Sequence, residues 1–170
     1  RVRVRAWLSR VGKSTQHETT PHRHHLIRAS NSSGMGSFRG LPSNEQTALL
    51  AGALTAHFRA GEIIFREGDP AGGVYFLRSG RVQIGLRLPD GQDQVLGVAK
   101  VGDTVGDLAA LDGGPRTATA IALEPTVADY VSREMFEMGL SAAPRAALRL
   151  LRTMAGRLRQ TDQLIGELIG

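Results

Sequence analysis

The sequence contains no cysteine among its 170 residues. This absence excludes disulfide bridges, zinc sites built on thiolates, iron–sulfur clusters held by cysteine and a cysteine nucleophile, and it favours a reducing compartment. Long apolar runs are absent too, and the basic opening RVRVRAWLSRVGK is too interrupted for the apolar core of a signal peptide. We therefore expect a cytoplasmic protein without a membrane partner.

Residues suited to catalysis or metal binding are also scarce. His57 is the only histidine after residue 40, and no nearby carboxylate or cysteine completes a metal site around His22, His24 and His25. A metal-dependent jelly-roll enzyme of the cupin kind needs paired histidines and a carboxylate on its strands, so it is excluded. No nucleophile with an adjacent base is recognisable. The sequence predicts a protein that is not an enzyme and holds no metal.

The positive charge of the sequence is concentrated in its first part. The net charge is +5, yet residues 1–40 hold eight of the 21 lysine and arginine residues and a single acid, Glu18, so the remainder is slightly acidic. This part also contains the linker-like run ASNSSGMGS. We expect residues 1–40 to be a disordered basic leader or linker, with contact to nucleic acid or a membrane surface as the alternative. Met35 offers an alternative start of translation.

Residues 41–170 are predicted to form one mainly β domain with flanking helices. Short β-rich runs alternate with turn residues, and no long helix intervenes. These runs are EIIFRE, VYFLR, RVQIGLRL, QVLGVA, TATAIALE and TVADYVS. Many short strands with tight turns favour an antiparallel β-roll, which is a double-stranded jelly roll, over a parallel α/β sheet. We expect the roll to cover about residues 57–132.

A short helix is expected to precede the roll. Ser43 is its candidate N-cap, and Gln46 three residues later completes a capping box. Leucines at helical spacing supply its apolar side, namely Leu49, Leu50 and Leu54.

Two helices are expected after the roll, at about residues 133–169. Ser132 is the candidate N-cap of the first, and Pro144 opens the longer second helix. Side chains on the second helix step by four and three residues, as in a coiled-coil seam. They are Ala147, Leu151, Met154, Leu158, Thr161, Ile165 and Leu168. We expect a homodimer along this helix, and the alternative is an amphipathic helix that packs on its own roll.

The segment VGDLAALDGGPRTATA, residues 105–120, concentrates the polar chemistry of the domain. Its GDLAAL part is predicted to be a short helix, because the apolar residues have helical spacing. The first amides of such a helix lack partners and favour an anion. These amides belong to Gly106, Asp107, Leu108 and Ala109.

An arginine follows the start of this helix at a suitable spacing. Pro115 places Arg116 nine residues after Asp107, where a short loop can turn the guanidinium back toward the helix amides. A guanidinium and helix amides together form a phosphate cradle. A carboxylate would repel the same anion, so we expect Asp107 to accept hydrogen bonds from sugar hydroxyls. An anion beside a sugar hydroxyl indicates a nucleotide ligand.

At these residues the chain resembles cyclic-nucleotide-binding domains. The stretches GDLA (106–109) and PRTA (115–118) are similar to the phosphate-binding cassette of that family, and GEIIFREGDPAGGVYFLRSGRVQI is similar to its second to fourth strands. The run MAGRLRQTDQLIGEL resembles the dimer helix of the Crp/Fnr group, the catabolite activator-like regulators of bacteria. The resemblance spans about Leu41 to Ile169.

The resemblance implies roles for individual residues and a ligand, either cyclic AMP or cyclic GMP. It implies that Arg116 grips the cyclic phosphate and that Gly106 and Leu108 donate backbone amides to it. Thr117 would add a hydroxyl near the phosphate or the purine. Thr161 lies where the dimer helix of the group presents a threonine to the base.

Two residues depart from the family's pattern. Asp107 stands where the family usually has glutamate, and its side chain is shorter by about 1.5 Å. A ribose contact from Asp107 would be longer, mediated by water or lost. Asp162 stands where a serine follows the threonine, and its carboxylate could accept a hydrogen bond from an adenine amino group.

The function implied is that of a cyclic-nucleotide-sensing regulatory domain of a bacterial Crp/Fnr-type transcriptional regulator. The helix-turn-helix of such regulators would follow the last residue printed, Gly170, so we expect DNA binding only through a domain outside this chain. One alternative is a sensor module attached to a channel, kinase or transporter. Another is a dimerisation module without ligand binding, in which Arg116 and Asp107 form a structural ion pair.

Overall fold

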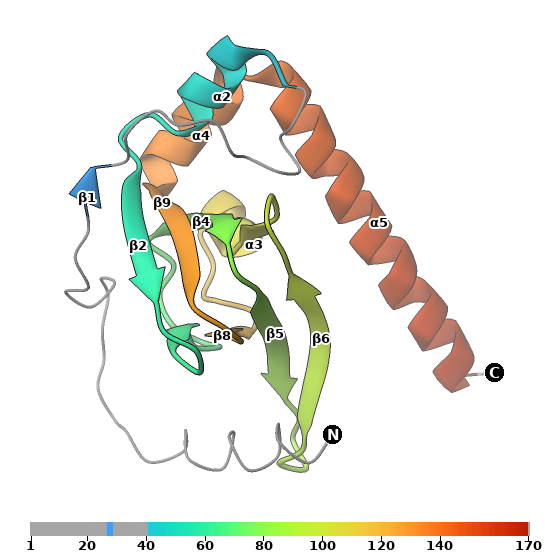
Figure 1. Cartoon of the computed structure of the whole chain (residues 1–170). Helices are drawn as coiled ribbons and strands as arrows, with labels where there is room; N and C mark the ends of the chain where they lie inside the picture. The colour runs from blue at the N-terminus through green and yellow to red at the C-terminus, as the bar shows by residue number, and fades with distance from the viewer. Residues whose placement is uncertain (1–26, 29–40, 170) are drawn as a thin grey trace.

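The structure is a computed structural model that describes residues 27–28 and 41–169. Figure 1 shows a roll of antiparallel strands with helices α2 (Ser43–Leu49) and α4 (Arg133–Ser141) at one end. The long α5 (Pro144–Ile169) starts beside them and runs along one side of the roll. The predicted fold class, a β-roll with flanking helices, is confirmed. None of the helices described combines the length and the apolar character needed to cross a membrane.

Two antiparallel sheets form the roll in the described part of the chain. Their strand orders are β1-β2-β9-β4-β7 and β3-β8-β5-β6. The strands are β1 (Ile27–Arg28), β2 (Leu54–Phe58), β3 (Ile63–Phe65), β4 (Gly73–Ser79), β5 (Val82–Arg87), β6 (Asp93–Ala99), β7 (Thr104–Val105), β8 (Thr119–Ala122) and β9 (Thr126–Ser132). Strand β1 belongs to the predicted leader and pairs with β2. The rest of that leader lies outside the described residues.

The six predicted β-rich runs correspond to β3, β4, β5, β6, β8 and β9. The prediction that Leu54 belongs to the first helix is wrong, because Gly52 turns the chain with a φ of 71° and Leu54 then begins β2. The roll therefore starts before residue 57. Strand β7 was not predicted either, because two residues are too few for an alternating pattern.

The predicted cap of α2 is also wrong. The N-cap is Pro42, and its carbonyl accepts hydrogen bonds from the amides of Glu45 (3.0 Å) and Gln46 (3.1 Å). Ser43 is already helical and makes no side-chain cap. The side chain of Gln46 instead donates to the carbonyl of Leu41 at 2.8 Å. The restricted φ of proline, −53° here, suits the entry to a helix, so the helix begins directly after it.

The central strand β4 is buried on both faces and separates two cores. Val74 and Phe76 face a core shared with the helices, while Tyr75 and Leu77 face the interior of the roll. The helix-side core also contains Leu41, Leu49, Ala53, Ala110, Val131, Phe136, Ala143, Ala146 and Leu150. Burial of each large side chain contributes roughly 1.5–3 kcal/mol. The two cores thus attach the helices to the roll through one strand.

Both C-terminal helices have defined starts. The predicted cap of α4 is confirmed, because the hydroxyl of Ser132 accepts a hydrogen bond from the amide of Met135 at 3.3 Å. Pro144 opens α5, as predicted. The first turn of α5 is capped by a distant side chain: a carboxylate oxygen of the buried Glu45 accepts from the amides of Arg145 (3.1 Å) and Ala146 (3.2 Å). Glu45 therefore joins α2 to α5.

Substitution Glu45→Ala is expected to destabilise the domain by roughly 1–3 kcal/mol, because the partly buried amide of Arg145 and the buried amide of Ala146 lose their acceptor. Denaturant unfolding measures the loss, and Glu45→Gln should lose less because one amide oxygen remains. The exposed Glu137 on α4 provides the control, and Glu137→Ala should change stability by less than about 0.5 kcal/mol. Equal stability of the Glu45 and Glu137 variants would contradict the capping role.

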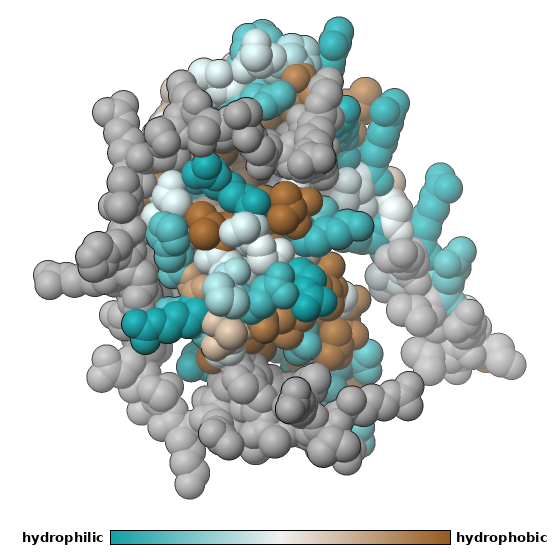
Figure 2. All heavy atoms as spheres, in the orientation of Figure 1, coloured by the Kyte–Doolittle hydropathy of each residue, from teal (hydrophilic) through white to brown (hydrophobic). Residues whose placement is uncertain are grey.

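Strand β6 leaves apolar side chains open to solvent. Val95, Leu96 and Val98 are exposed on it, and Val101 is exposed just after it. Figure 2 shows apolar atoms gathered on this side of the roll. Within the described residues β6 pairs with β5 alone and forms the edge of its sheet. An apolar edge of this kind is a surface that other molecules can contact.

Candidate functional site

The predicted short helix is present as α3 (Asp107–Asp112). Its N-cap is Gly106, which has a φ of 84° in the left-handed region where glycine is favoured. A Cβ at Gly106 would collide with the Nη1 atom of Arg116. The glycine is therefore required both by its backbone conformation and by the close approach of the arginine.

Arg116 lies in the loop before β8 and reaches back to the start of α3. Its backbone is fixed by two hydrogen bonds with the loop after β3: its amide donates to Asp69 (2.8 Å) and its carbonyl accepts from Gly68 (2.8 Å). Its Nη1 atom donates to the carbonyl of Gly106 at 2.9 Å. Its Nη2 atom donates to the carbonyl of Gly73, at the start of β4, at 2.7 Å. The guanidinium thus joins α3 to the central strand.

The charge of Arg116 is poorly compensated. The residue is only 4% exposed, and its Nε atom is buried without a hydrogen-bond partner. Among the described residues no carboxylate forms an ion pair with it within 4.0 Å. Burial lowers the pKa of the guanidinium, while the negative charges of the nearby Asp69 and Asp107 oppose that shift. An arginine keeps its proton even so, which leaves a buried cation ready for an anion.

Aromatic side chains surround this cation. The guanidinium carbon of Arg116 lies 4.2 Å from the centre of the Phe65 ring, a cation–π geometry. Tyr75 stacks on Phe65 at 6.2 Å between ring centres, and Tyr130 lies 5.1 Å from Tyr75. Burial raises the pKa of both tyrosines, so both hydroxyls stay neutral. None of these three aromatic residues was predicted as a site residue, although each lies in a predicted strand.

Asp107 does not pair with Arg116, the partner expected if the two residues formed a structural ion pair. It is 3% exposed, and its carboxylate is bound by Arg157 of α5, whose Nη1 atom lies 3.1 Å from Oδ1 and 3.4 Å from Oδ2. The hydroxyl of Thr104 donates to Oδ2 at 3.0 Å, and the amide of Leu108 donates to Oδ1 at 3.0 Å. The proposed Arg116–Asp107 pair is therefore not formed, because each residue binds other groups.

Thr104 and Arg157 were not predicted as site residues. A signal for Arg157 existed in the sequence, because it lies four residues before Thr161 and so on the same face of the helix. Thr104 had no such signal, since its role depends on the turn between β7 and α3. Together with Asp107 these residues link the cassette to α5.

The other predicted residues are placed as follows. Ala109 is buried, whereas Leu108, Pro115 and Thr117 are exposed beside the cassette. The hydroxyl of Thr161 donates to the carbonyl of Arg157 one turn earlier, at 3.1 Å. Asp162 is exposed on α5. The structure thus brings Gly106, Asp107, Leu108 and Arg116 together, and it leaves Thr161 and Asp162 on α5, one turn beyond Arg157.

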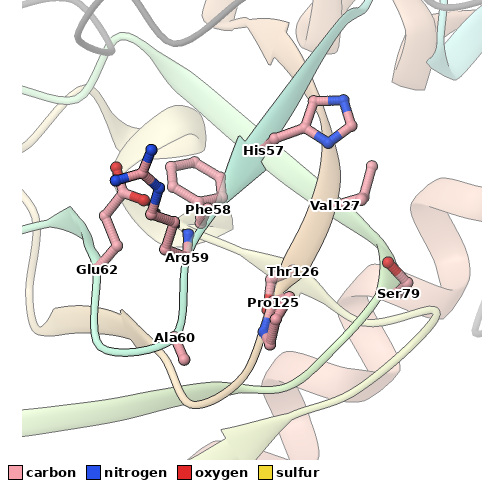
Figure 3. A pocket seen from close by; sticks show the side chains of 9 residues that line it. All are labelled: His57, Phe58, Arg59, Ala60, Glu62, Ser79, Pro125, Thr126 and Val127. Atoms are coloured by element: carbon pink, nitrogen blue, oxygen red, sulfur yellow. Dashed lines mark hydrogen bonds between the residues drawn. The ribbon is translucent and has the colours of Figure 1, made fainter.

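A separate cavity of about 570 Å³ lies at the turns between strands. Figure 3 shows its lining residues, which are His57, Phe58, Arg59, Ala60, Glu62, Ser79, Pro125, Thr126 and Val127. None of the predicted site residues lines it. Within the described residues, no cluster of three or more histidines or carboxylates is placed to hold a metal ion. The cassette therefore remains the candidate site.

Comparison with known proteins gives consistent matches. The family model described as "Cyclic nucleotide-binding domain" matches residues 55–142. The CRP-like cAMP-activated global transcriptional regulator of Mycobacterium tuberculosis is 33% identical over 134 residues, which is 79% of this chain and 60% of that protein. The acetyltransferase Pat of Mycolicibacterium smegmatis is 31% identical over 78% of this chain and 39% of its own length.

A solved structure is similar as well. The crystal structure of the catabolite activator protein of Thermus thermophilus matches with a TM-score of 0.71 and 30% identity, over 78% of this chain and 62% of that one. The chain spans about 60% of the length of the first curated regulators that it matches.

Proposed function

We propose, because the chain belongs to the cyclic nucleotide-binding domain family, that it binds a cyclic nucleotide as the sensing domain of a bacterial transcriptional regulator of the Crp/Fnr type. The observation that carries this proposal is the buried guanidinium of Arg116, whose Nε atom has no hydrogen-bond partner. A cyclic phosphate would supply both the missing acceptor and the missing negative charge. Arg116 is therefore the proposed phosphate anchor.

Other cassette residues complete the proposed site. Gly106 would donate its amide to the phosphate, and its missing side chain gives the arginine and a ligand room to approach. The amide of Leu108 is already bound to Asp107, so its donation to a phosphate would require that bond to open. Thr117 is exposed after Arg116 and would place its hydroxyl near the phosphate or purine. Ala109 and Pro115 shape the helix and the loop that hold these groups.

We propose cyclic AMP as the ligand in preference to cyclic GMP. The relative from Mycobacterium tuberculosis is named as cAMP-activated, and it matches most of this chain. Thr161 and Asp162 are exposed on α5 and offer a hydroxyl and a carboxylate. These groups would meet the adenine amino group once the base is placed against α5.

The proposed assembly is a homodimer through α5. Leu151, Leu158 and Ile165 are exposed at intervals of seven residues along this helix. Two other residues of the predicted seam differ from these three. Met154 packs partly against the chain's own core, and the side chain of Leu168 lies outside the described part of the structure. An apolar stripe with a seven-residue repeat favours a partner helix. DNA binding would belong to a domain outside this chain.

A linkage between ligand and output would run through Asp107 and Arg157. This pair connects α3, in the proposed ligand site, to α5, in the proposed dimer interface. A ligand changes the balance between two arrangements only through its different affinity for each. A nucleotide that alters the Asp107–Arg157 bond would therefore alter the position of α5.

A second candidate function is a regulatory domain attached to an enzyme. The acetyltransferase Pat is 31% identical over 78% of this chain, so a similar domain occurs in a protein named as an enzyme. The proposed ligand site is the same in both cases, and only the attached output differs.

Calorimetric titration with cyclic AMP and cyclic GMP tests the proposed function. Saturable binding of cyclic AMP at one site per chain is expected, with weaker binding of cyclic GMP. Linear 5′-AMP serves as the control, because it carries the same base and sugar without the cyclic phosphate. A chain that binds neither cyclic nucleotide would contradict the proposal.

A further inference from the structure

The carboxylate of Asp107 has its acceptor positions filled within the protein. Oδ1 accepts from the Leu108 amide (3.0 Å) and from Arg157 (3.1 Å). Oδ2 accepts from the Thr104 hydroxyl (3.0 Å) and, at 3.4 Å, from the same nitrogen of Arg157. Each carboxylate oxygen accepts about two hydrogen bonds, so both are saturated. A sugar hydroxyl can donate to this buried carboxylate only by displacing one of these donors.

The donors differ in how easily they can leave. Leu108 follows Asp107 directly and Thr104 precedes it by three residues, so both are held by the local backbone. Arg157 reaches the carboxylate from a different element, fifty residues away in sequence, and its side chain is 47% exposed. An exposed arginine can return its guanidinium to water at small cost. Arg157 is therefore the donor that a ligand hydroxyl would replace.

We infer that Arg157 competes with the sugar 2′-hydroxyl of the ligand for Asp107, so that the domain discriminates weakly between ribose and 2′-deoxyribose cyclic nucleotides. This inference rests on the proposed function. The exchange replaces one charge-assisted hydrogen bond to the carboxylate by another, so the hydroxyl adds little net affinity. Arg157 is thus a specificity-determining residue that acts from α5 on the sugar position of the site.

Removal of Arg157 is expected to make the domain discriminate between ribose and 2′-deoxyribose cyclic nucleotides. In Arg157→Met the apolar stem stays, but one acceptor position of each Asp107 oxygen loses its donor. A ligand hydroxyl would then satisfy a buried charge that otherwise has too few partners. The affinity of the variant should therefore depend on the 2′-hydroxyl much more strongly than that of the parent.

The test measures the affinities of cyclic AMP and 2′-deoxy cyclic AMP for both proteins by calorimetry. In the parent, the ratio of the two affinities is expected to be below about threefold, and in Arg157→Met it should rise to about tenfold or more. The control is Arg152→Met, which removes an exposed arginine of the same helix on another face. Its ratio should equal that of the parent. Thermal unfolding of the three proteins without ligand confirms that each is folded.

The possible failures are distinguishable. If the parent binds 2′-deoxy cyclic AMP tenfold or more weakly than cyclic AMP, the 2′-hydroxyl contributes directly to its affinity. This result would overturn the inference that Arg157 competes for Asp107, and it would leave the proposed function intact. An unchanged ratio in Arg157→Met overturns the inference as well. If none of the proteins binds cyclic AMP, cyclic GMP or the deoxy ligand, the proposed function fails and the inference fails with it.

Discussion

Substitution Arg116→Ala is expected to weaken cyclic nucleotide binding by about thirty- to a thousandfold, which corresponds to about 2–4 kcal/mol. The phosphate would lose a charge-assisted, bidentate contact inside a site where little solvent can replace it. Calorimetric titration of parent and variant measures the change directly. The lower end of the range applies if water enters the space left by the guanidinium.

The same variant is expected to remain folded. It loses hydrogen bonds to the carbonyls of Gly106 and Gly73, but it also removes a desolvated charge with an unsatisfied Nε atom. The matched control is Arg81→Ala, because Arg81 is an exposed arginine whose guanidinium binds Glu124 at 2.9 Å. Its removal should leave affinity unchanged. A folded Arg116 variant with the parent's affinity would show that the phosphate is bound elsewhere.

Local signals in the sequence were sufficient to predict most of the roll. Strands such as β4 and β9 are long enough for their β-branched and aromatic residues to be recognised, and glycines mark the turns between them. Gly80 shows why a turn needs glycine: its φ is 87°, and a Cβ there would collide with the backbone of Pro125. The three missed strands lacked such signals: β1 and β7 have two residues each, and β2 follows α2 so closely that Leu54 continues the leucine spacing of the helix.

The candidate site could be predicted only where its residues are close in sequence. Gly106 and Arg116 are ten residues apart, and their contact could be inferred from a short helix and a loop. The contact of Arg116 with Gly73 spans 43 residues, and that of Asp107 with Arg157 spans 50. Contacts of this kind depend on how the strands and α5 pack in three dimensions. The partners of the two key side chains therefore required the structure.

The sequence also did not reveal which apolar residues of α5 stay exposed. The spacing of its apolar residues predicted a stripe, but spacing cannot tell whether the chain covers that stripe itself. The structure divides it: Met154 packs partly on the helix-side core, whereas Leu151, Leu158 and Ile165 remain exposed. The proposed homodimer rests on this exposed part. It would also place Thr161 and Asp162 close to the interface.

Substitution Leu158→Glu is expected to convert the proposed dimer into a monomer whose roll stays folded. Leu158 is 62% exposed and lies between Leu151 and Ile165 on the exposed stripe of α5. In a symmetric dimer the two introduced carboxylates would be brought together and removed from water, which is far more costly than leaving each exposed on a monomer. Because the residue is exposed in the single chain, the roll should be little affected.

Analytical ultracentrifugation of the parent and variant at tens of micromolar, with and without cyclic AMP, measures this change. The matched control is Gln163→Glu, which adds the same charge on an exposed position about 140° around the helix from Leu158. This control should keep the parent's sedimentation. A parent that is monomeric with and without ligand, or a Leu158→Glu variant that still dimerises, would mean that the exposed stripe of α5 is not the dimer interface.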